Sequence, residues 1–159
     1  MQKISPCLWF DDKAEEAARF YTSIIPGSKM GTVTYYGESG PRPKGTVLAV
    51  TFQLNGQDFM ALNGGPDFTF SPAISLVVKC ESQEEIDRYW EKLSADKAAE
   101  QCGWLKDKYG VSWQIVPAIL ERLISDPDPA KSDRVMAAVM KMRKLDIAEL
   151  KRAHAGERR

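Results

Sequence analysis

The sequence predicts an α+β fold made of two βαβββ modules followed by C-terminal helices. In each half of the chain an amphipathic helical segment follows a short strand, and three further strands can be placed after it. The helical segments 15–21 and 84–90 match at a constant shift of 69 residues, and the closing strands 59–61 and 113–115 match at a shift of 54. The smaller second shift indicates a shorter middle part in the second copy.

A chain of 159 residues has the length of one domain. We predict a single domain over 1–159, with the first module at 1–66, the second at 70–117 and a helical extension at 118–159. Twenty-two basic residues balance 22 acidic ones, so no excess of positive charge is present to attract nucleic acid or an anionic membrane surface. We therefore expect neither partner.

Hydropathy and cysteine usage bear on the location of the protein. No apolar run approaches the roughly 20 residues that span a bilayer, and the N-terminal apolar stretch stops at Asp11 and Asp12, too early for a signal peptide. The three cysteines are odd in number and widely spaced, which argues against a disulfide framework. These features predict a soluble cytoplasmic protein with free thiols.

The first module begins with a predicted strand at 4–10, in which Ile4, Leu8 and Phe10 share one face and Ser5, Cys7 and Trp9 share the other. Asp12 and Glu15 are spaced as a capping box and predict a helix that ends at Pro26. The apolar stripe of this helix is Ala17, Phe20, Tyr21 and Ile24.

Three strands are predicted to complete the first module, at 29–36, 46–54 and 58–63. The segment 37–45 is a loop by composition. Asn55 and Gly56 are typical of the tight turn of a hairpin.

The second module repeats the order with a strand at 73–80, a capping box at Ser82 and Glu85, and a helix. The apolar stripe of this helix is Ile86, Tyr89, Trp90 and Leu93. The segment 94–101 is ambiguous and leaves room for a short strand. A hairpin over 102–117, turning at 107–110, closes the module.

Helices are predicted to follow. Pro117 suits a first helical position, and the run at 126–129 is a break. Apolar residues at helical spacing predict a helix over 132–142. Asp146 is expected to cap a last helix through Leu150, and the end at 154–159 is expected to fray.

The blocks SPCLWFDDKAEEAARFY at 5–21, NGQDFMALNGG at 55–65 and CGWLKDKYGVSWQIVP at 102–117 resemble the vicinal-oxygen-chelate superfamily of glyoxalases, bleomycin-resistance proteins and extradiol dioxygenases. Within it the chain looks most like the PhnB-like branch, which often carries the label 3-demethylubiquinone-9 3-methyltransferase. The resemblance implies a glyoxalase-like, U-shaped, mixed and mostly antiparallel sheet whose concave face holds a ligand. It also implies a homodimer.

In metal-dependent members of the superfamily, four residues of the concave face bind a divalent ion. Carried over, these places fall on Ser5, Met60, Ala73 (or Ile74, if the register slips by one) and Gln114. Serine, methionine, alanine and isoleucine supply no carboxylate, imidazole or thiolate, and Gln114 offers one neutral carbonyl, so this set suits a divalent ion poorly. We therefore predict no metal and no cofactor.

The predicted binding site for a small-molecule ligand consists of Ser5, Cys7, Trp9, Met60, Trp104 and Gln114. Trp9 and Met60 are expected to supply apolar contact and Gln114 an amide. Trp104 faces Gln114 only if the hairpin turns at 107–110, whereas Trp113 is expected in the core.

Three functions remain open from the sequence: a small-molecule-binding protein or metal-independent enzyme of unknown substrate, a metal-dependent lyase or dioxygenase with unusual ligands, and a ligand-sequestering protein without turnover. Whether the chain is an enzyme is undecided. Cys7 and Cys102 are candidate nucleophiles, but no histidine stands near them in the sequence, which favours buried structural thiols. Arg42 and Lys44 either clamp an acidic ligand or lie on a solvated loop.

The methyltransferase label implies a methyl donor. No glycine-rich turn follows a predicted strand and opens a helix. The residues therefore give the label no physical support.

Overall fold

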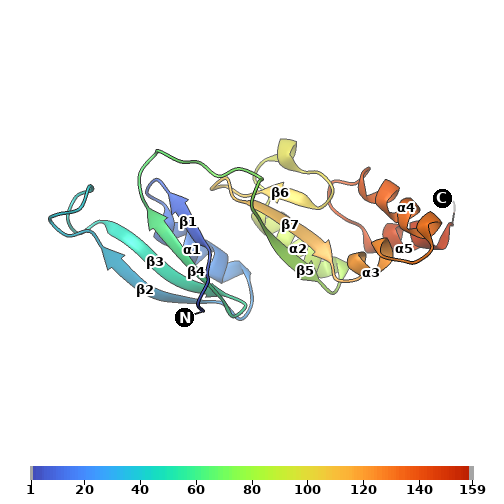
Figure 1. The fold of residues 1–159 in the computed structure, drawn as a ribbon, viewed down its shortest axis with the longest axis horizontal. Helices are drawn as coiled ribbons and strands as arrows, with labels where there is room; N and C mark the ends of the chain where they lie inside the picture. The colour runs from blue at the N-terminus through green and yellow to red at the C-terminus, as the bar shows by residue number, and fades with distance from the viewer. Residues whose placement is uncertain (1, 158–159) are drawn as a thin grey trace. The chain divides into compact units, whose positions relative to one another are not determined.

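The computed structural model describes residues 2–157, which form two compact units that meet in sequence between Phe70 and Ser71 (Figure 1). Each unit has its own sheet, and strand orientations are mixed in both. The α+β class is thereby confirmed. No helix within 2–157 is long and apolar enough to cross a membrane.

The first unit is a complete βαβββ module. Its sheet has the strand order β1-β4-β3-β2, in which β1 runs parallel to β4 and the other two pairs are antiparallel. The elements are β1 (Cys7–Phe10), α1 (Ala14–Ile24), β2 (Lys29–Tyr35), β3 (Val47–Leu54) and β4 (Gln57–Asn63). Strand β1 is shorter than predicted, and Ile4, placed on its inner face by the alternation, is 88% exposed.

One face of this sheet is buried beneath α1, and its apolar side chains come from three strands. The buried set is Leu8, Phe10, Val50, Phe52, Phe59 and Ala61. The residues between them in β1, β3 and β4 point to the opposite side, which we call the open face of the first sheet.

The start of α1 differs from the prediction. Asp12 does not cap it. The N-cap is Lys13, whose side chain makes no capping bond, and the first helical N–H, that of Ala14, donates to Asn63 Oδ1 at 2.8 Å. Asn63 also donates through Nδ2 to Val47 O at 3.2 Å, so one buried amide joins the helix to two strands.

The second unit contains a shortened module. Its sheet has the order β5-β7-β6, with β5 parallel and β6 antiparallel to β7. The elements are β5 (Ser75–Cys80), α2 (Gln83–Leu93), a 3-10 turn η1 (Lys97–Ala99), β6 (Trp104–Lys106) and β7 (Ser112–Pro117). Helices α1 and α2 have the same length and begin 69 residues apart, at Ala14 and Gln83, which confirms the helix alignment.

The extra strand that 94–101 left room for does not form. Asp96 instead accepts a hydrogen bond from Ala98 N and opens η1. Cys102 and Gly103, with φ of 54° and 83°, then turn the chain back at once, so Gln101 bridges Trp104. The second copy is therefore strand, helix and two strands.

Helix α2 starts as predicted, because Ser82 Oγ accepts from Glu85 N at 3.2 Å. Buried residues of the sheet on the α2 side are Leu105, Trp113 and Ile115. Trp90, predicted as core, is only half-buried. The residues between the buried ones form the open face of the second sheet.

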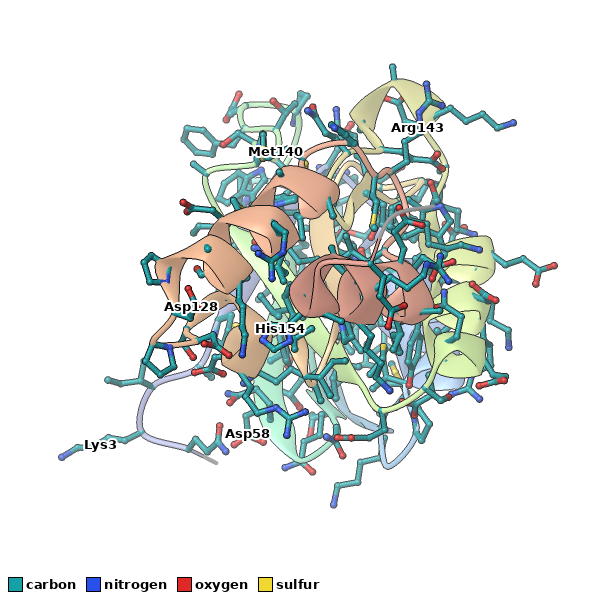
Figure 2. All side chains as sticks on the ribbon, turned by 90° about the vertical axis from the view of Figure 1, so that its right-hand side faces the viewer. Lys3, Asp58, Asp128, Met140, Arg143 and His154 are labelled. Carbon is teal, nitrogen blue, oxygen red and sulfur yellow. The ribbon has the colours of Figure 1, made fainter. Side chains whose placement is uncertain are left out.

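The helical extension consists of α3 (Leu120–Ile124), α4 (Pro129–Val139) and α5 (Ile147–Ala155), gathered at the end of the second sheet where β7 stops (Figure 1). It has a core of its own, which is Leu123, Val135, Val139, Leu145 and Leu150. In Figure 2, which faces the extension, Met140 lies at the end of α4 and His154 on α5.

Several predicted helix boundaries in the extension are wrong. Pro117 ends β7 rather than starting a helix. Helix α4 begins at Pro129, because Asp128 caps it by accepting from Ala130 N. Asp146 caps α5 as predicted, but the helix continues to Ala155, so His154 lies in a helix and not in a frayed end. Residues 158 and 159 lie outside the described part.

Candidate functional site

Strand register places three of the predicted site residues on the open face of the first sheet. Cys7 in β1 is paired with Met60 in β4, and Met60 with Thr51 in β3. Trp9 lies two residues after Cys7 and therefore on the same face. Ser5 precedes β1 and is half-buried, so it lies beside this group and not on a paired strand.

Trp9 is firmly held by the turn that follows β4. Its indole Nε1 donates to Gly65 O at 2.9 Å, and its ring meets Phe68 edge-on with centroids 5.0 Å apart. Gly64 lies flat against the ring, since a Cβ there would be 2.2 Å from a ring carbon. With its N–H used internally, Trp9 offers a ligand only apolar surface.

Cys7 is exposed, which contradicts the expectation of a buried structural thiol. Desolvation of its sulfur nevertheless raises the pKa of the Cys7 thiol, so the thiol form dominates at neutral pH. A nucleophilic cysteine needs a lowered pKa or an adjacent base. Cys7 therefore presents a polarizable, uncharged thiol on this face.

A shallow depression of about 200 Å³ lies over β2, β3 and β4, lined by Lys29, Gln53 and Asp58 together with Met30, Gly31, Thr51, Phe52 and Phe59. Asp58 is 7% exposed and accepts hydrogen bonds from Gln53 Nε2 at 2.6 Å and from Gln2 N. These two donors, Gln53 first, lower the pKa of the Asp58 carboxyl. Sequence analysis missed this buried carboxylate, because an aspartate at a strand end gives no signal of its distant partner Gln2.

The open face of the second sheet carries the other two strand residues of the predicted site. Gln114 in β7 is flanked by Val77 of β5 and Trp104 of β6. The predicted hairpin register, with Trp104 opposite Gln114, is confirmed. Trp113 points the other way and is 2% exposed, as expected for core.

Gln114 has a partner that the sequence did not reveal. Its Nε2 donates to Ser75 Oγ at 2.9 Å, which fixes the orientation of the amide and leaves Oε1 to accept from a ligand. Strand β5 begins at Ser75, so Ala73 and Ile74 precede it, and both are exposed. Val77 is therefore the β5 residue paired with Gln114, and Ser75, rather than Ala73 or Ile74, is the β5 residue hydrogen-bonded to its side chain.

The hairpin turn at 107–110 is structural. Asp107, 3% exposed, accepts from Tyr109 N at 2.8 Å, from Val111 N at 3.0 Å and from Trp113 Nε1 at 2.8 Å. This single carboxylate organises the turn and orients the core tryptophan. The distinctive sequence of this block thus serves the hairpin that presents Gln114.

Two other candidates are engaged in pairs. Arg42 Nη1 donates to Asp11 O at 2.9 Å, and Lys44 Nζ lies 2.7 Å from Glu38 Oε1. His154 Nε2 is 2.8 Å from Asp126 Oδ2 within the extension. Arg42 Nη1 also lies 3.6 Å from the position that a Cβ would take at Gly65, the residue whose carbonyl binds Trp9.

The places that hold a divalent ion in metal-dependent relatives do not fit such an ion here. Met60 contributes a thioether, and the amide nitrogen of Gln114 is committed to Ser75. Hard and borderline divalent ions require carboxylates, imidazoles or thiolates. Within 2–157, no three His, Cys, Asp or Glu side chains gather closely enough to hold a metal ion.

A methyl donor of the kind bound at a glycine-rich strand-to-helix turn does not fit either. The two such turns, 11–13 before α1 and 81–82 before α2, contain no glycine. One N–H at each helix start is bound within the chain, that of Ala14 by Asn63 and that of Glu85 by Ser82.

Comparison with known proteins connects this arrangement to one family. Residues 2–116 match the family model described as 3-demethylubiquinone-9 3-methyltransferase. Among solved structures, the PhnB protein from Bacillus cereus is 45% identical, with 74% of this chain covering 100% of that one at a TM-score of 0.63. The protein PA1353 from Pseudomonas aeruginosa is 18% identical, with 74% of this chain covering 98% of that one at a TM-score of 0.56. A search of the curated proteins found no match.

Proposed function

This chain belongs to the family described as 3-demethylubiquinone-9 3-methyltransferase, in the PhnB-like branch of the vicinal-oxygen-chelate superfamily, and on that premise we propose that it binds a small organic molecule without a metal ion. The protein is then a small-molecule-binding protein or a metal-independent enzyme. The contacts that we propose are Ser5, Cys7, Trp9 and Met60 on the first unit, and Trp104 and Gln114 on the second.

The observation that carries the proposal is the fixed amide of Gln114. Ser75 binds its nitrogen, and its carbonyl oxygen is left as an acceptor for an N–H or O–H of the ligand. Trp104 on one side and Val77, 53% exposed, on the other supply apolar surface. A neutral acceptor between apolar walls suits a planar organic molecule better than an ion.

The first sheet supports the same chemistry. Trp9 and Met60 are half-buried apolar side chains on its open face, and Cys7 beside them carries a thiol whose pKa is raised by desolvation. These side chains bind by shape and dispersion.

Native mass spectrometry of freshly purified, untagged protein tests the proposal. We expect an organic molecule to be retained by the wild-type protein and lost in Gln114→Ala, while the exposed Gln101→Ala variant retains it. Elemental analysis of the same sample must find no stoichiometric metal. A tightly held divalent ion would instead support the metal-dependent lyase or dioxygenase, and an organic ligand retained by Gln114→Ala would refute the site.

A ligand-sequestering role without turnover is the second candidate. It is favoured by the raised pKa of the Cys7 thiol and by the position of the chain's one histidine, His154, which is paired with Asp126 in the extension. Incubation of the purified protein with its retained ligand, followed by mass analysis, distinguishes the two roles. Consumption of many equivalents would exclude sequestration.

We also propose that the protein is a cytoplasmic homodimer. Its three cysteines are unpaired, as in a reducing compartment. The edge strands of both sheets offer unpaired backbone groups to a second copy. Light scattering after size exclusion should give about twice the monomer mass, and a monomer at micromolar concentration would refute the dimer.

A further inference from the structure

Two sulfur atoms of the second unit face each other at the end of α4 (Figure 2). Cys102 Sγ lies 3.9 Å from Met140 Sδ, in a geometry in which the thiol donates to the thioether. A lone pair of the Met140 sulfur is therefore aimed at Cys102. Met140 is 57% exposed and Cys102 is half-buried, so an ion from solution can reach the pair.

Backbone hydrogen bonds hold the two segments that carry these sulfurs. Cys102 N donates to Met142 O at 2.8 Å, and Gly103 N donates to Arg143 O at 2.8 Å. These bonds tie the turn before β6 to the chain that follows α4. Cys102 also packs against the core of the extension. The thiol is therefore kept beside the end of α4 without any bond that uses its sulfur for folding alone.

A further thioether stands one helical turn before Met140. Met140 N donates to Met136 O at 3.0 Å, so the two methionines lie on the same side of α4. Met136 is 44% exposed, and its three side-chain torsions allow the sulfur to move. Met136 can therefore supply a third sulfur to an ion held between Cys102 and Met140.

The separation of the first two sulfurs suits one soft metal ion. Metal–thiolate bonds are about 2.3 Å long, and two such bonds at a trigonal angle place their sulfurs about 4 Å apart. The observed separation of 3.9 Å is close to that value. Thiolate and thioether are donors that select Cu(I), whereas hard divalent ions prefer oxygen. A zinc site needs at least three Cys, His, Asp or Glu ligands, and no such trio gathers within 2–157.

We propose that Cys102 and Met140, with Met136 as a third donor, form a binding site for a single Cu(I) ion. Each sulfur forms one bond to the copper, and the Cys102 thiol releases its proton to solvent. Copper enters and stays as Cu(I), so no electron is transferred. None of the three donors is among the proposed contacts of the organic ligand, so the inference goes beyond the proposed function and does not depend on it.

Competition against bicinchoninate, a chromophoric Cu(I) chelator, tests the site. The protein is reduced and stripped of metal, and Cu(I) is then the only metal added, without oxygen. We expect one Cu(I) per wild-type chain. Cys102→Ser should bind it at least about a hundredfold more weakly, since loss of an outer-shell partner alone costs about ten- to a hundredfold in metal affinity. The apparent affinity should rise with pH, because binding releases a proton.

The methionine variants separate the two thioethers. Met140→Leu keeps an apolar side chain without sulfur and should weaken Cu(I) binding by about tenfold. Met136→Leu should weaken it by less. If Cys102→Ser does not fold, because residue 102 has a φ of 54°, Met140→Leu alone decides, since Met140 is exposed and its replacement leaves the fold intact.

Two variants of the first unit serve as matched controls. Cys7→Ser removes an exposed thiol, and Met30→Leu removes a half-buried thioether of β2. Both should bind Cu(I) as tightly as the wild-type protein. A loss in Cys7→Ser equal to that in Cys102→Ser would overturn the site, as would an unchanged affinity in Met140→Leu or no binding by the wild-type protein.

The same variants distinguish this ion from one on the open faces. Copper retained by the purified protein should be lost in Cys102→Ser and kept in Gln114→Ala. The reverse result would place the ion at Gln114, which would overturn both the Cu(I) site and the metal-free ligand site.

Discussion

The two copies of the module secure the same elements by different means. In the first copy, α1 is capped by Asn63, 49 residues away in the chain, whereas α2 is capped by its own Ser82. In the first copy the closing hairpin turns in two residues, Asn55 and Gly56, both with positive φ. In the second it turns around the buried carboxylate of Asp107.

Each copy is consequently vulnerable in a different place. The first copy depends on long-range contacts for its helix and on glycines where its strands approach closely. The second depends on one buried acid in its hairpin and has a locally capped helix. Equivalent elements should therefore respond unequally to mutation.

The largest effect is expected from Asp107→Ala in the second copy. The change leaves three N–H groups without their acceptor, among them the buried Nε1 of Trp113, at about 4 kcal/mol of unfolding free energy in total. Urea denaturation followed by tryptophan fluorescence measures it. Asp107→Asn keeps one acceptor oxygen and should lose less, and a loss in Asp107→Ala below about 1 kcal/mol would show that the carboxylate does not organise the turn.

The second-largest loss of stability is expected from Gly64→Ala, which lies in the first copy. An added Cβ would be 2.2–2.5 Å from three atoms of the Trp9 ring, so the ring must move and its bond to Gly65 O is lost. We expect about 2 kcal/mol of destabilisation with a changed Trp9 emission. Gly37→Ala, where a Cβ meets nothing within 4 Å, is the control, and an unchanged emission in Gly64→Ala would contradict the packing.

The helix caps allow a direct comparison of the copies. Asn63→Ala removes a 5% exposed amide that bonds both Ala14 N and Val47 O, and should cost about 2 kcal/mol. Ser82→Ala removes one local capping bond and should cost about 1 kcal/mol. Equilibrium unfolding measures the loss of unfolding free energy in both variants. A larger loss in Ser82→Ala than in Asn63→Ala would show that the local cap contributes more stability than the long-range one.

The smallest change in stability is expected on lowering the pH. The Asp128 backbone N–H, followed by His154, lowers the pKa of the Asp126 carboxyl, and Lys144, followed by Gln83, lowers the pKa of the Asp87 carboxyl. A folded pKa below the unfolded one contributes stability that is present above about pH 4 and is lost as pH falls through the folded pKa.

Unfolding titrations from neutral to strongly acidic pH measure this contribution. Asp126→Asn should flatten the fall of stability in the acid range, while Asp133→Asn, an exposed carboxyl of α4, should leave it unchanged. A steeper fall in Asp126→Asn would mean that folding raises the pKa of Asp126 instead of lowering it.

Features encoded by neighbouring residues were predictable. Ser82 and Glu85 placed α2, Asn55 and Gly56 placed the first hairpin, and alternation along β7 separated Trp113 from Gln114. In each case the residues that determine the structure lie within a few positions of one another. The constant helix shift then fixed the relation of the two copies.

Features that depend on distant partners were not predictable. The spacing of Asp12 and Glu15 predicted a capping box, yet the first helical N–H is bound by Asn63, which lies on strand β4. The segment 94–101 lost its strand because Cys102, a non-glycine residue, adopts a left-handed conformation in an immediate turn. The residue type at position 102 does not indicate that its backbone is left-handed.

The candidate site shows the same division. The pairing of Trp104 with Gln114 followed from the length of the hairpin turn. Ser75 was missed because β5 starts two residues later than predicted, and because its bond to Gln114 joins residues 39 positions apart in the chain. Asp58 was missed because its donors come from the N-terminal residue Gln2 and from the neighbouring strand.

The side-chain amide of Gln83 couples the unfolding of two helices of the second unit. Gln83, in the first turn of α2, donates through Nε2 to Leu145 O and accepts through Oε1 from Ile147 N, and Lys144 Nζ lies 2.7 Å from Asp87 Oδ1 one turn later. The start of α2 is therefore bound to the segment that leads into α5 by two hydrogen bonds of one side chain and by one ion pair. A protease that cuts the segment between α4 and α5 would leave the last helix attached, and amide exchange at both helix starts would report a single opening event.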